Sequence, residues 1–407
     1  MRHGCLTTVV VVLFLIGVCF FAGKLILDRI GLEMHHQDTI VKEQKGGSTT
    51  AEEVTEETAQ SETKQEGAGK ERFYYEQLSK EEQKVYDKLL QGMEALSEKI
   101  RISYLNSDDI NKIYKWVLKD HPEIFWCGSS YRSVSYQGLT SYVIIKPEYL
   151  FDQEERNEKQ REIDAEVDAC LMGIDASASD YEKILYVYEY LVNSVDYEEG
   201  SEYNQTIYSI FAKKRSVCAG YAKAAQYLLN ELDVFCTYVT GTIRDSQVSH
   251  GWNLVRCEGD YYYVDPTWGD PLFQSGEKED IDNINYDYMC CNDEELFKTH
   301  KPEGDVSLPA CTEMDWNYYV VNHMYYTQVD EDGLLQAMKD TIFTKEKSTT
   351  FKFASNSLYA QAREVLFDDL IRQAARILGN RYGVRQVKYS YLDDEERNKI
   401  VIYWNYE

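Results

Sequence analysis

The chain has 407 residues, with 70 acidic against 43 basic side chains and a net charge of −27. That length favours more than one domain, and 43% apolar residues supply a core, which argues against wholesale disorder. The negative charge argues against nucleic acid as a partner, because phosphate binding depends on clustered Lys and Arg. Ten cysteines without a CxxC pair exclude a zinc ribbon or a thioredoxin-like motif. We also expect no metal site and no cofactor.

An apolar run opens the chain. Residues 6–23 carry no charge, and residues 25–27 extend the run beyond Lys24. An apolar stretch of about 18 residues or more can cross a bilayer as a helix, and no small-residue cleavage site follows. We therefore expect a transmembrane anchor, rather than a signal peptide, at 6–27 with a cytoplasmic tip at 1–5. The protein would then be a single-pass membrane protein with an extracellular body, or secreted if the segment is cleaved.

Residues 28–71 are rich in Glu, Thr, Ser, Gln and Gly and nearly free of large apolar side chains. Such a segment cannot bury enough surface to offset the entropy of ordering it. We expect a disordered linker that tethers a globular body to the membrane.

Helical and strand signals alternate across residues 72–175, which we expect to form an N-terminal α/β region. Ser79 and Glu82 have the spacing of a capping box ahead of a helix. A second helix is expected at 108–119. An alternating segment at 131–145 predicts a strand pair that turns near Gln137, and further helices should begin near residues 153 and 180.

The most informative stretch begins with Cys218, which stands at the start of an amphipathic helix just after the basic run 213–215. Helix N-terminal amides and nearby cations favour the nucleophilic thiolate form of a cysteine. A strand is expected at 235–242. A hairpin of 251–257 and 261–265 should follow, turning at 258–260.

His250 stands at the entry of this hairpin, and Asp265 ends it. Cys, His and Asp are the parts of a thiol acyl-transfer site: the thiolate attacks a carbonyl, the imidazole moves the proton, and the carboxylate orients the imidazole. A simple register puts Asp265 on the same face as His250 but nearest Leu254, about 13 Å away along the strand. We therefore expect a bulge or bend at Ser249 and His250 to close that gap.

The motifs SVCAGYAKA, HGWNLV and YYYVDPTWGDP, in that order, resemble the transglutaminase-like superfamily of papain-like cysteine enzymes. The resemblance covers about residues 180–271. It implies a papain-like α+β core at 176–315 with Cys218 as nucleophile, His250 as general base and acid, and Asp265 as orienting carboxylate. Family members often carry Glu after the cysteine and Ala after the histidine, where this chain has Ala219 and Gly251. The departure changes the charge near the thiolate but leaves the triad intact.

Other residues of this stretch are weaker candidates. The backbone amide of Cys218 is a reasonable oxyanion donor, and Gln205 or Tyr208 could add a side-chain donor. Trp252 and Trp268 are expected to wall the cleft, as packing residues rather than substrate contacts. Residues 316–407 predict a C-terminal α+β accessory region, with a helix from 360 to 378 stopped by Gly379 and a closing hairpin.

Three functions remain open on the sequence. The first is transglutaminase-like acyl transfer at protein or peptide amides on the cell exterior. The second is a cysteine protease or peptidoglycan-peptide hydrolase with the same triad. The third is an inactive module that binds peptides or a cell-envelope component. The expected partners are thus a protein or peptide substrate and the membrane, and the sequence does not define an oligomeric state.

Overall fold

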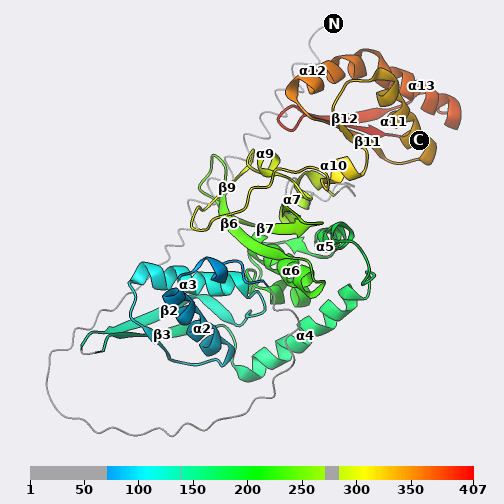
Figure 1. The fold of residues 1–407 in the computed structure, drawn as a ribbon. Helices are drawn as coiled ribbons and strands as arrows, with labels where there is room; N and C mark the ends of the chain where they lie inside the picture. The colour runs from blue at the N-terminus through cyan, green and yellow to red at the C-terminus, as the bar shows by residue number, and fades with distance from the viewer. Residues whose placement is uncertain (1–70, 139, 271–283) are drawn as a thin grey trace.

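A computed structural model describes residues 71–138, 140–270 and 284–407. The expected anchor at 6–27 and nearly all of the expected linker lie outside these residues. Within the described ranges, every helix is too short or too polar to cross a bilayer. The N-terminal, central and C-terminal regions follow one another along an elongated molecule (Figure 1). The boundaries expected between them, near residues 175 and 315, stay predictions.

The N-terminal region contains a three-stranded antiparallel sheet of order β1-β3-β2 with two helices. The capping box is confirmed: Ser79 and Glu82 exchange hydrogen bonds at the start of the first long helix. The second helix and the strand pair also form where the sequence predicts them. The elements are η1 (Tyr75–Gln77), α2 (Lys80–Glu94), β1 (Ile100–Ser103), α3 (Ser107–Asp120), β2 (Cys127–Tyr136) and β3 (Tyr142–Tyr149).

Two capped helices lead from this sheet into the centre of the molecule (Figure 1). Helix α4 (Gln153–Leu171) begins at a capping box of Asp152 and Glu155. Helix α5 (Asp180–Ser194) begins at a capping box of Ser179 and Glu182, and one of its faces is buried. The N-terminal region is joined to the central sheet directly, since Tyr74 Oη donates to the Tyr238 carbonyl at 2.7 Å.

The central region is built on a four-stranded antiparallel sheet of order β8-β7-β6-β9. Helix α6 packs on this sheet, and Asn253 Nδ2 donates to the Ala222 carbonyl at 2.8 Å to join β7 to the helix. The elements are β4 (Asp196–Tyr197), η2 (Ser209–Lys213), β5 (Arg215–Ser216), α6 (Cys218–Glu231), β6 (Cys236–Ile243), β7 (Ser249–Cys257), β8 (Asp260–Val264), α7 (Pro266–Gly269), η3 (Tyr286–Tyr288), α9 (Asp293–Leu296) and β9 (His300–Pro302).

The register of the β7–β8 hairpin corrects the expected bulge. Cys257 pairs with Asp260 across Glu258 and Gly259, and both loop residues have positive φ, as a tight hairpin turn requires. Continuing this register places Asp265 across from Trp252 rather than Leu254. Asp265 is then offset from His250 by a two-residue step, about 7 Å along the strand. The pairing of β6 with β7 runs without a shift through His250, so the bulge was a wrong expectation.

The C-terminal region has its own sheet, of order β10-β11-β13-β12, and its own buried apolar cluster. The single helix expected to stop at Gly379 is wrong: a π-helical segment interrupts it, and it continues to Tyr382 and ends at Gly383, whose φ is 70°. The elements are α10 (Tyr318–Val321), β10 (Tyr325–Tyr326), α11 (Glu331–Thr344), β11 (Ser348–Phe353), α12 (Asn356–Val365), η4 (Leu366–Leu370), α13 (Ile371–Tyr382), β12 (Tyr389–Asp394) and β13 (Lys399–Trp404).

Candidate active site

Cys218 is the first residue of α6 and is half-exposed. The other seven described cysteines are buried, and none of the eight forms a disulfide. The turn that leads into the helix is fixed by Asn204, whose carbonyl accepts hydrogen bonds from Ser216 Oγ at 2.6 Å and from the Val217 amide at 3.3 Å. Gly220 permits this approach, because a Cβ there would lie 1.9 Å from Ser216 Oγ. Among the described cysteines, this geometry presents one thiol at a helix N-terminus within reach of solvent.

His250 lies on β7 and contacts Asp265 at the end of β8. The His250 Nε2 to Asp265 Oδ2 distance is 2.7 Å, and both side chains are buried. Asp265 also begins α7, since its Oδ1 accepts from the amides of Thr267 at 3.0 Å and Trp268 at 3.3 Å. One carboxylate oxygen is thus used for capping and the other for histidine, so the carboxylate cannot rotate without losing hydrogen bonds.

Electrostatics favours a charged pair here. Burial opposes the imidazolium form of His250, but the Asp265 carboxylate, with a smaller contribution from Cys218, outweighs it and raises the pKa of His250 from 6.5 to about 10. Burial likewise opposes the Asp265 carboxylate, and His250 and His300 outweigh it, so the pKa of Asp265 falls well below its usual range. At neutral pH His250 is protonated and Asp265 is ionised.

Cys218 acts on the same imidazole. After burial and the effects of Asp265, the side-chain hydrogen bond and charge of Cys218 contribute to raising the pKa of His250. The charge of Cys218 also contributes, behind burial, to raising the pKa values of Tyr197 and Tyr238. The charge of Cys218 thus acts on His250 and on both tyrosines.

The weaker candidates separate into two groups. The Trp252 and Trp268 rings lie 6.1 and 5.9 Å from the His250 ring, so both adjoin the site. Gln205 is exposed beside the first turns of α6, where its carbonyl accepts from Lys223 Nζ at 3.0 Å. Tyr208 is buried among other aromatic side chains, and its hydroxyl donates to Glu162 on α4 at 3.3 Å. Tyr208 thus points into the core.

One residue of the cluster, His300, is not predicted by any sequence motif. His300, at the start of β9, is fully buried, and its Nε2 lies 3.0 Å from Asp265 Oδ2, the same oxygen that contacts His250. The antiparallel pairing of β9 with β6, in which Ile243 pairs with His300, brings it there. The sequence around it, KTHKP, has neither the spacing of a metal site nor a catalytic motif.

The nitrogens and oxygen of His250, Asp265 and His300 lie within 4.8 Å of one another, a grouping that a metal ion could use. The contacts favour hydrogen bonds instead. Both imidazole Nε2 atoms face one carboxylate oxygen at 2.7 and 3.0 Å, the ordinary length of an N–H···O bond. A zinc ion, with ligands at about 2.0–2.2 Å, would have to displace both protons and spread the three atoms around itself.

Comparison with known proteins agrees with this geometry. The model of the transglutaminase-like superfamily matches residues 172–266, which include Cys218, His250 and Asp265. No curated protein matches the chain.

Solved structures give weaker likenesses. A transglutaminase is 13% identical with a TM-score of 0.25, covering 44% of this chain and 52% of its own. A candidate cysteine protease from Cytophaga hutchinsonii is 16% identical with a TM-score of 0.22, covering 35% and 64%. A candidate protease from Parabacteroides distasonis is 10% identical with a TM-score of 0.22, covering 36% and 38%. The chain thus spans less than two thirds of each of these proteins. The assignment rests on the family model: residues 172–266 are a domain of the transglutaminase-like superfamily.

Proposed function

We propose that this protein is a thiol acyltransferase that acts on protein or peptide amides, with Cys218 as nucleophile, His250 as acid and base, and Asp265 as orienting carboxylate. The observation that carries the proposal is a buried His250–Asp265 ion pair together with a half-exposed thiol, Cys218, that contributes to the raised pKa of the same imidazole. A cysteine with a purely structural role would not require protonated His250, a buried cation that Asp265 stabilises.

The chemistry proceeds in two halves. The Cys218 thiolate attacks the amide carbonyl carbon and forms a C–S bond, and the carbonyl π electrons move onto oxygen. Collapse breaks the C–N bond, His250 gives its proton to the departing nitrogen, and a thioester remains on Cys218. An incoming amine then loses a proton to His250, attacks the thioester carbon and releases the thiolate. The products are a new amide and ammonia when the first amide is that of a glutamine side chain.

The developing oxyanion needs donors that are already in place. The first backbone amides of a helix have no partner within the helix, so the Cys218 amide at the start of α6 is the first candidate. Gln205 lies beside the same turn and is exposed, which makes it the second. Tyr208 lacks this placement because its hydroxyl is used by Glu162.

We propose further that the protein works at the cell membrane, with an extracellular catalytic body held by the apolar run at residues 6–27. This proposal rests on sequence: a run long enough to span a bilayer is followed by a polar segment. The substrate would then be a protein or peptide outside the cell, including peptides of the envelope.

The test uses the full-length chain in mild detergent, a labelled primary amine and a glutamine-rich acceptor protein. We expect incorporation of the amine that is lost in Cys218→Ala and His250→Ala. Cys127→Ala, at a buried cysteine outside the site, is the control for general thiol effects. Peptide cleavage without amine incorporation would replace the acyl transferase by a hydrolase with the same triad. If neither activity appears and alkylation fails to select Cys218, the domain is a binding module and the proposal is wrong.

A further inference from the structure

We propose that His300 is a positioning residue of the active site, and that Arg397 of the C-terminal region sets its tautomer through a chain of hydrogen bonds that ends on Asp265. The chain runs from Arg397 through Tyr288, Thr299 and His300 to the oxygen that also binds His250. The catalytic role of this chain rests on the proposed function. Its geometry, and the positions of the protons along it, do not.

The direction of the chain follows from its first member. Arginine has only donors, so Arg397 Nη2 must donate to Tyr288 Oη, which accepts. Burial holds the pKa of Tyr288 well above its usual range, so the phenol keeps its proton at neutral pH. That one proton is then free to be donated to Thr299 Oγ1, 3.1 Å away.

The donor role of Tyr288 determines how Thr299 bonds to His300. With Tyr288 donating to it, the Thr299 hydroxyl has one proton and two acceptors in reach: His300 Nδ1 at 2.8 Å and the Leu296 carbonyl at 3.3 Å. The shorter contact favours His300, so Nδ1 accepts and carries no proton. Neutral His300 must then hold its proton on Nε2, which donates to Asp265 Oδ2 at 3.0 Å.

The surroundings keep His300 neutral. Burial lowers its pKa from the ordinary 6.5; the Asp265 carboxylate opposes this, and the positive charges of His250 and Arg397 add to it. Its other close neighbours are the rings of Trp252, Trp268 and Tyr288, at 4.9, 5.1 and 5.3 Å, and these carry no charge at neutral pH. His300 and His250 therefore share one carboxylate but differ in charge.

Sharing the oxygen has a consequence for His250. A carboxylate oxygen that already accepts a hydrogen bond attracts a second proton donor less strongly, because part of its charge is stabilised. His300 thus weakens the interaction of Asp265 with protonated His250. It also fixes the orientation of the carboxylate plane. Both effects act on catalysis through Asp265, without contact between His300 and the substrate.

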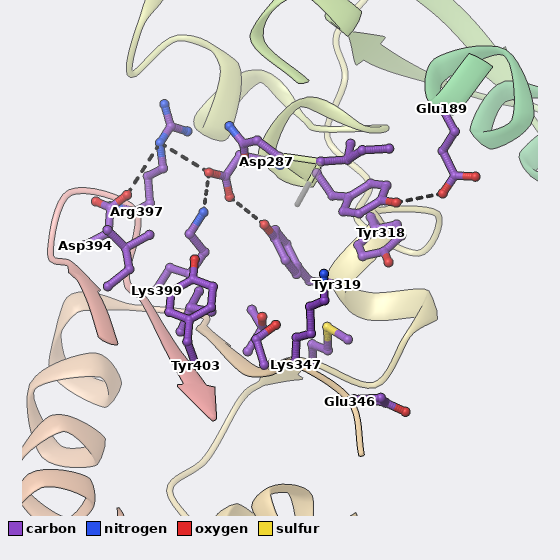
Figure 2. A pocket seen from close by; sticks show the side chains of 18 of the residues that line it. Glu189, Asp287, Tyr318, Tyr319, Glu346, Lys347, Asp394, Arg397, Lys399 and Tyr403 are labelled. Atoms are coloured by element: carbon purple, nitrogen blue, oxygen red, sulfur yellow. Dashed lines mark hydrogen bonds and ion pairs between the residues drawn. The ribbon is translucent and has the colours of Figure 1, made fainter. Parts of the chain in front are cut away.

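Arg397 is held in a fixed position, so it can set the direction of the hydrogen bonds that lead to His300. It lies between β12 and β13, and Figure 2 shows it with Asp287 and Asp394 at one end of a cavity of about 830 Å³ between the central and C-terminal regions. Its Nε lies 3.7 Å from Asp287 Oδ2 and 3.9 Å from Asp394 Oδ2. Lys399 also contacts Asp287, at 2.5 Å, so the C-terminal region is fastened to the centre by buried ion pairs. The catalytic carboxylate is thereby linked to a region outside the family match.

The direct test is to measure which ring nitrogen of His300 carries the proton. Full-length protein labelled with ¹⁵N-histidine is studied by long-range ¹H–¹⁵N spectra at pH 7.5, and the His300 signals are assigned by their loss in His300→Gln. We expect a neutral ring with the proton on Nε2. In Arg397→Met we expect proton density to move toward Nδ1, while Arg363→Met, which removes an exposed ion pair of the same region, should leave the signals unchanged. A proton on Nδ1 in the unaltered protein, or a doubly protonated ring, overturns the proposal whether or not the protein is active.

Kinetics give the second readout, using the amine-incorporation assay. Loss of an outer partner typically costs about 10–100-fold, so we expect such a fall in kcat/KM for His300→Phe, carried by kcat, with KM nearly unchanged. The alkaline limb of its pH profile should move upward, because Asp265 then holds the His250 proton more tightly. His300→Gln, which keeps a donor toward Asp265, should recover most of the rate. An active protein in which His300→Phe has the original rate and pH profile refutes the positioning role, whereas an inactive Cys218 would refute the proposed function and leave the tautomer test intact.

Discussion

His250 Nε2 lies 2.7 Å from Asp265 Oδ2, and the two side chains are 3% and 0% exposed. The two-residue hairpin loop places the residues on one face of the sheet, and the capping of α7 by Asp265 fixes the carboxylate. A charge pair this deeply buried persists only if each partner is held by the other and by further hydrogen bonds.

Asp265→Asn should remove the charge and keep the size. The carboxamide can still cap α7, but burial is then opposed only by the smaller contribution of Cys218, so the pKa of His250 should fall well below about 10. The corresponding change in a serine protease triad lowers kcat about 10⁴-fold, and we expect a loss of that order here. An NMR titration of His250 measures the pKa. A midpoint still near 10 would show that Asp265 is not its cause.

The same pair predicts a pH dependence of stability. Asp265 has a lowered pKa, so its contribution is complete above its ordinary 3.8 and is lost as the pH falls further. His250 has a raised pKa, so its contribution is complete below 6.5 and is lost as the pH rises through about 10.

The difference in unfolding free energy between the original protein and Asp265→Asn should therefore be largest between about pH 4 and 6.5, at about 3–5 kcal/mol. Urea unfolding at several pH values measures it. A difference that keeps growing above pH 7 would contradict the assignment of charges.

Much of this site follows from local sequence, and the rest depends on long-range pairing. Cys218 at a helix start and His250 at a strand entry follow from periodicity, turn residues and family motifs. His300 does not, since only the pairing of β9 with β6 brings it to Asp265. The distance from Asp265 to His250 was overestimated because it depends on the loop length of one hairpin, which determines the whole register.

The C-terminal region shows the same limit. Gly379 looks like a helix stop, yet the helix passes through it and ends at Gly383, whose positive φ closes the last turn. Two glycines about one helical turn apart cannot be ranked as helix stops by sequence pattern alone. The link from Arg397 to the site is equally hidden, because its contact Tyr288 is 109 residues away in sequence.

Cys218 should be the preferred target of iodoacetamide among cysteines 127–311. It is half-exposed at a helix N-terminus, whereas the other described cysteines are buried, and burial raises the pKa of Cys127, one of these, to about 11. Peptide mapping after brief alkylation at pH 7 measures the site of modification. Equal labelling of Cys218 and Cys127 would remove the argument for an activated thiol.

Gly241→Ala should disturb the active site from the opposite strand. A Cβ at this position of β6 would lie 2.2 Å from the Lys301 carbonyl and 2.6 Å from the Trp252 ring. The backbone of β9 must move, and His300 moves with it. Overpacking of this kind costs about 1–3 kcal/mol, and we expect a loss of activity larger than the loss of stability explains. Gly138→Ala, with nothing within 4 Å of its Cβ, is the matched control. Normal kcat in Gly241→Ala would show that the β9 strand does not influence the site.

Lys399→Met should loosen the attachment of the C-terminal region. Lys399 Nζ lies 2.5 Å from Asp287 Oδ2, with both side chains less than a tenth exposed, and its removal leaves the Asp287 carboxylate with Arg397 and Tyr319 as remaining partners. Removing one partner of a buried pair typically costs about 3–5 kcal/mol, and the remaining partners should keep the loss toward the lower end.

Arg363→Met breaks the exposed pair with Asp393 in the same region and should cost no more than about 1 kcal/mol. Thermal unfolding and limited proteolysis near residue 320 compare the two variants. Because Asp287 directly precedes Tyr288, Lys399→Met should also weaken the hydrogen-bond order that reaches His300. Equal stability of the two variants would mean that these ion pairs do not hold the regions together.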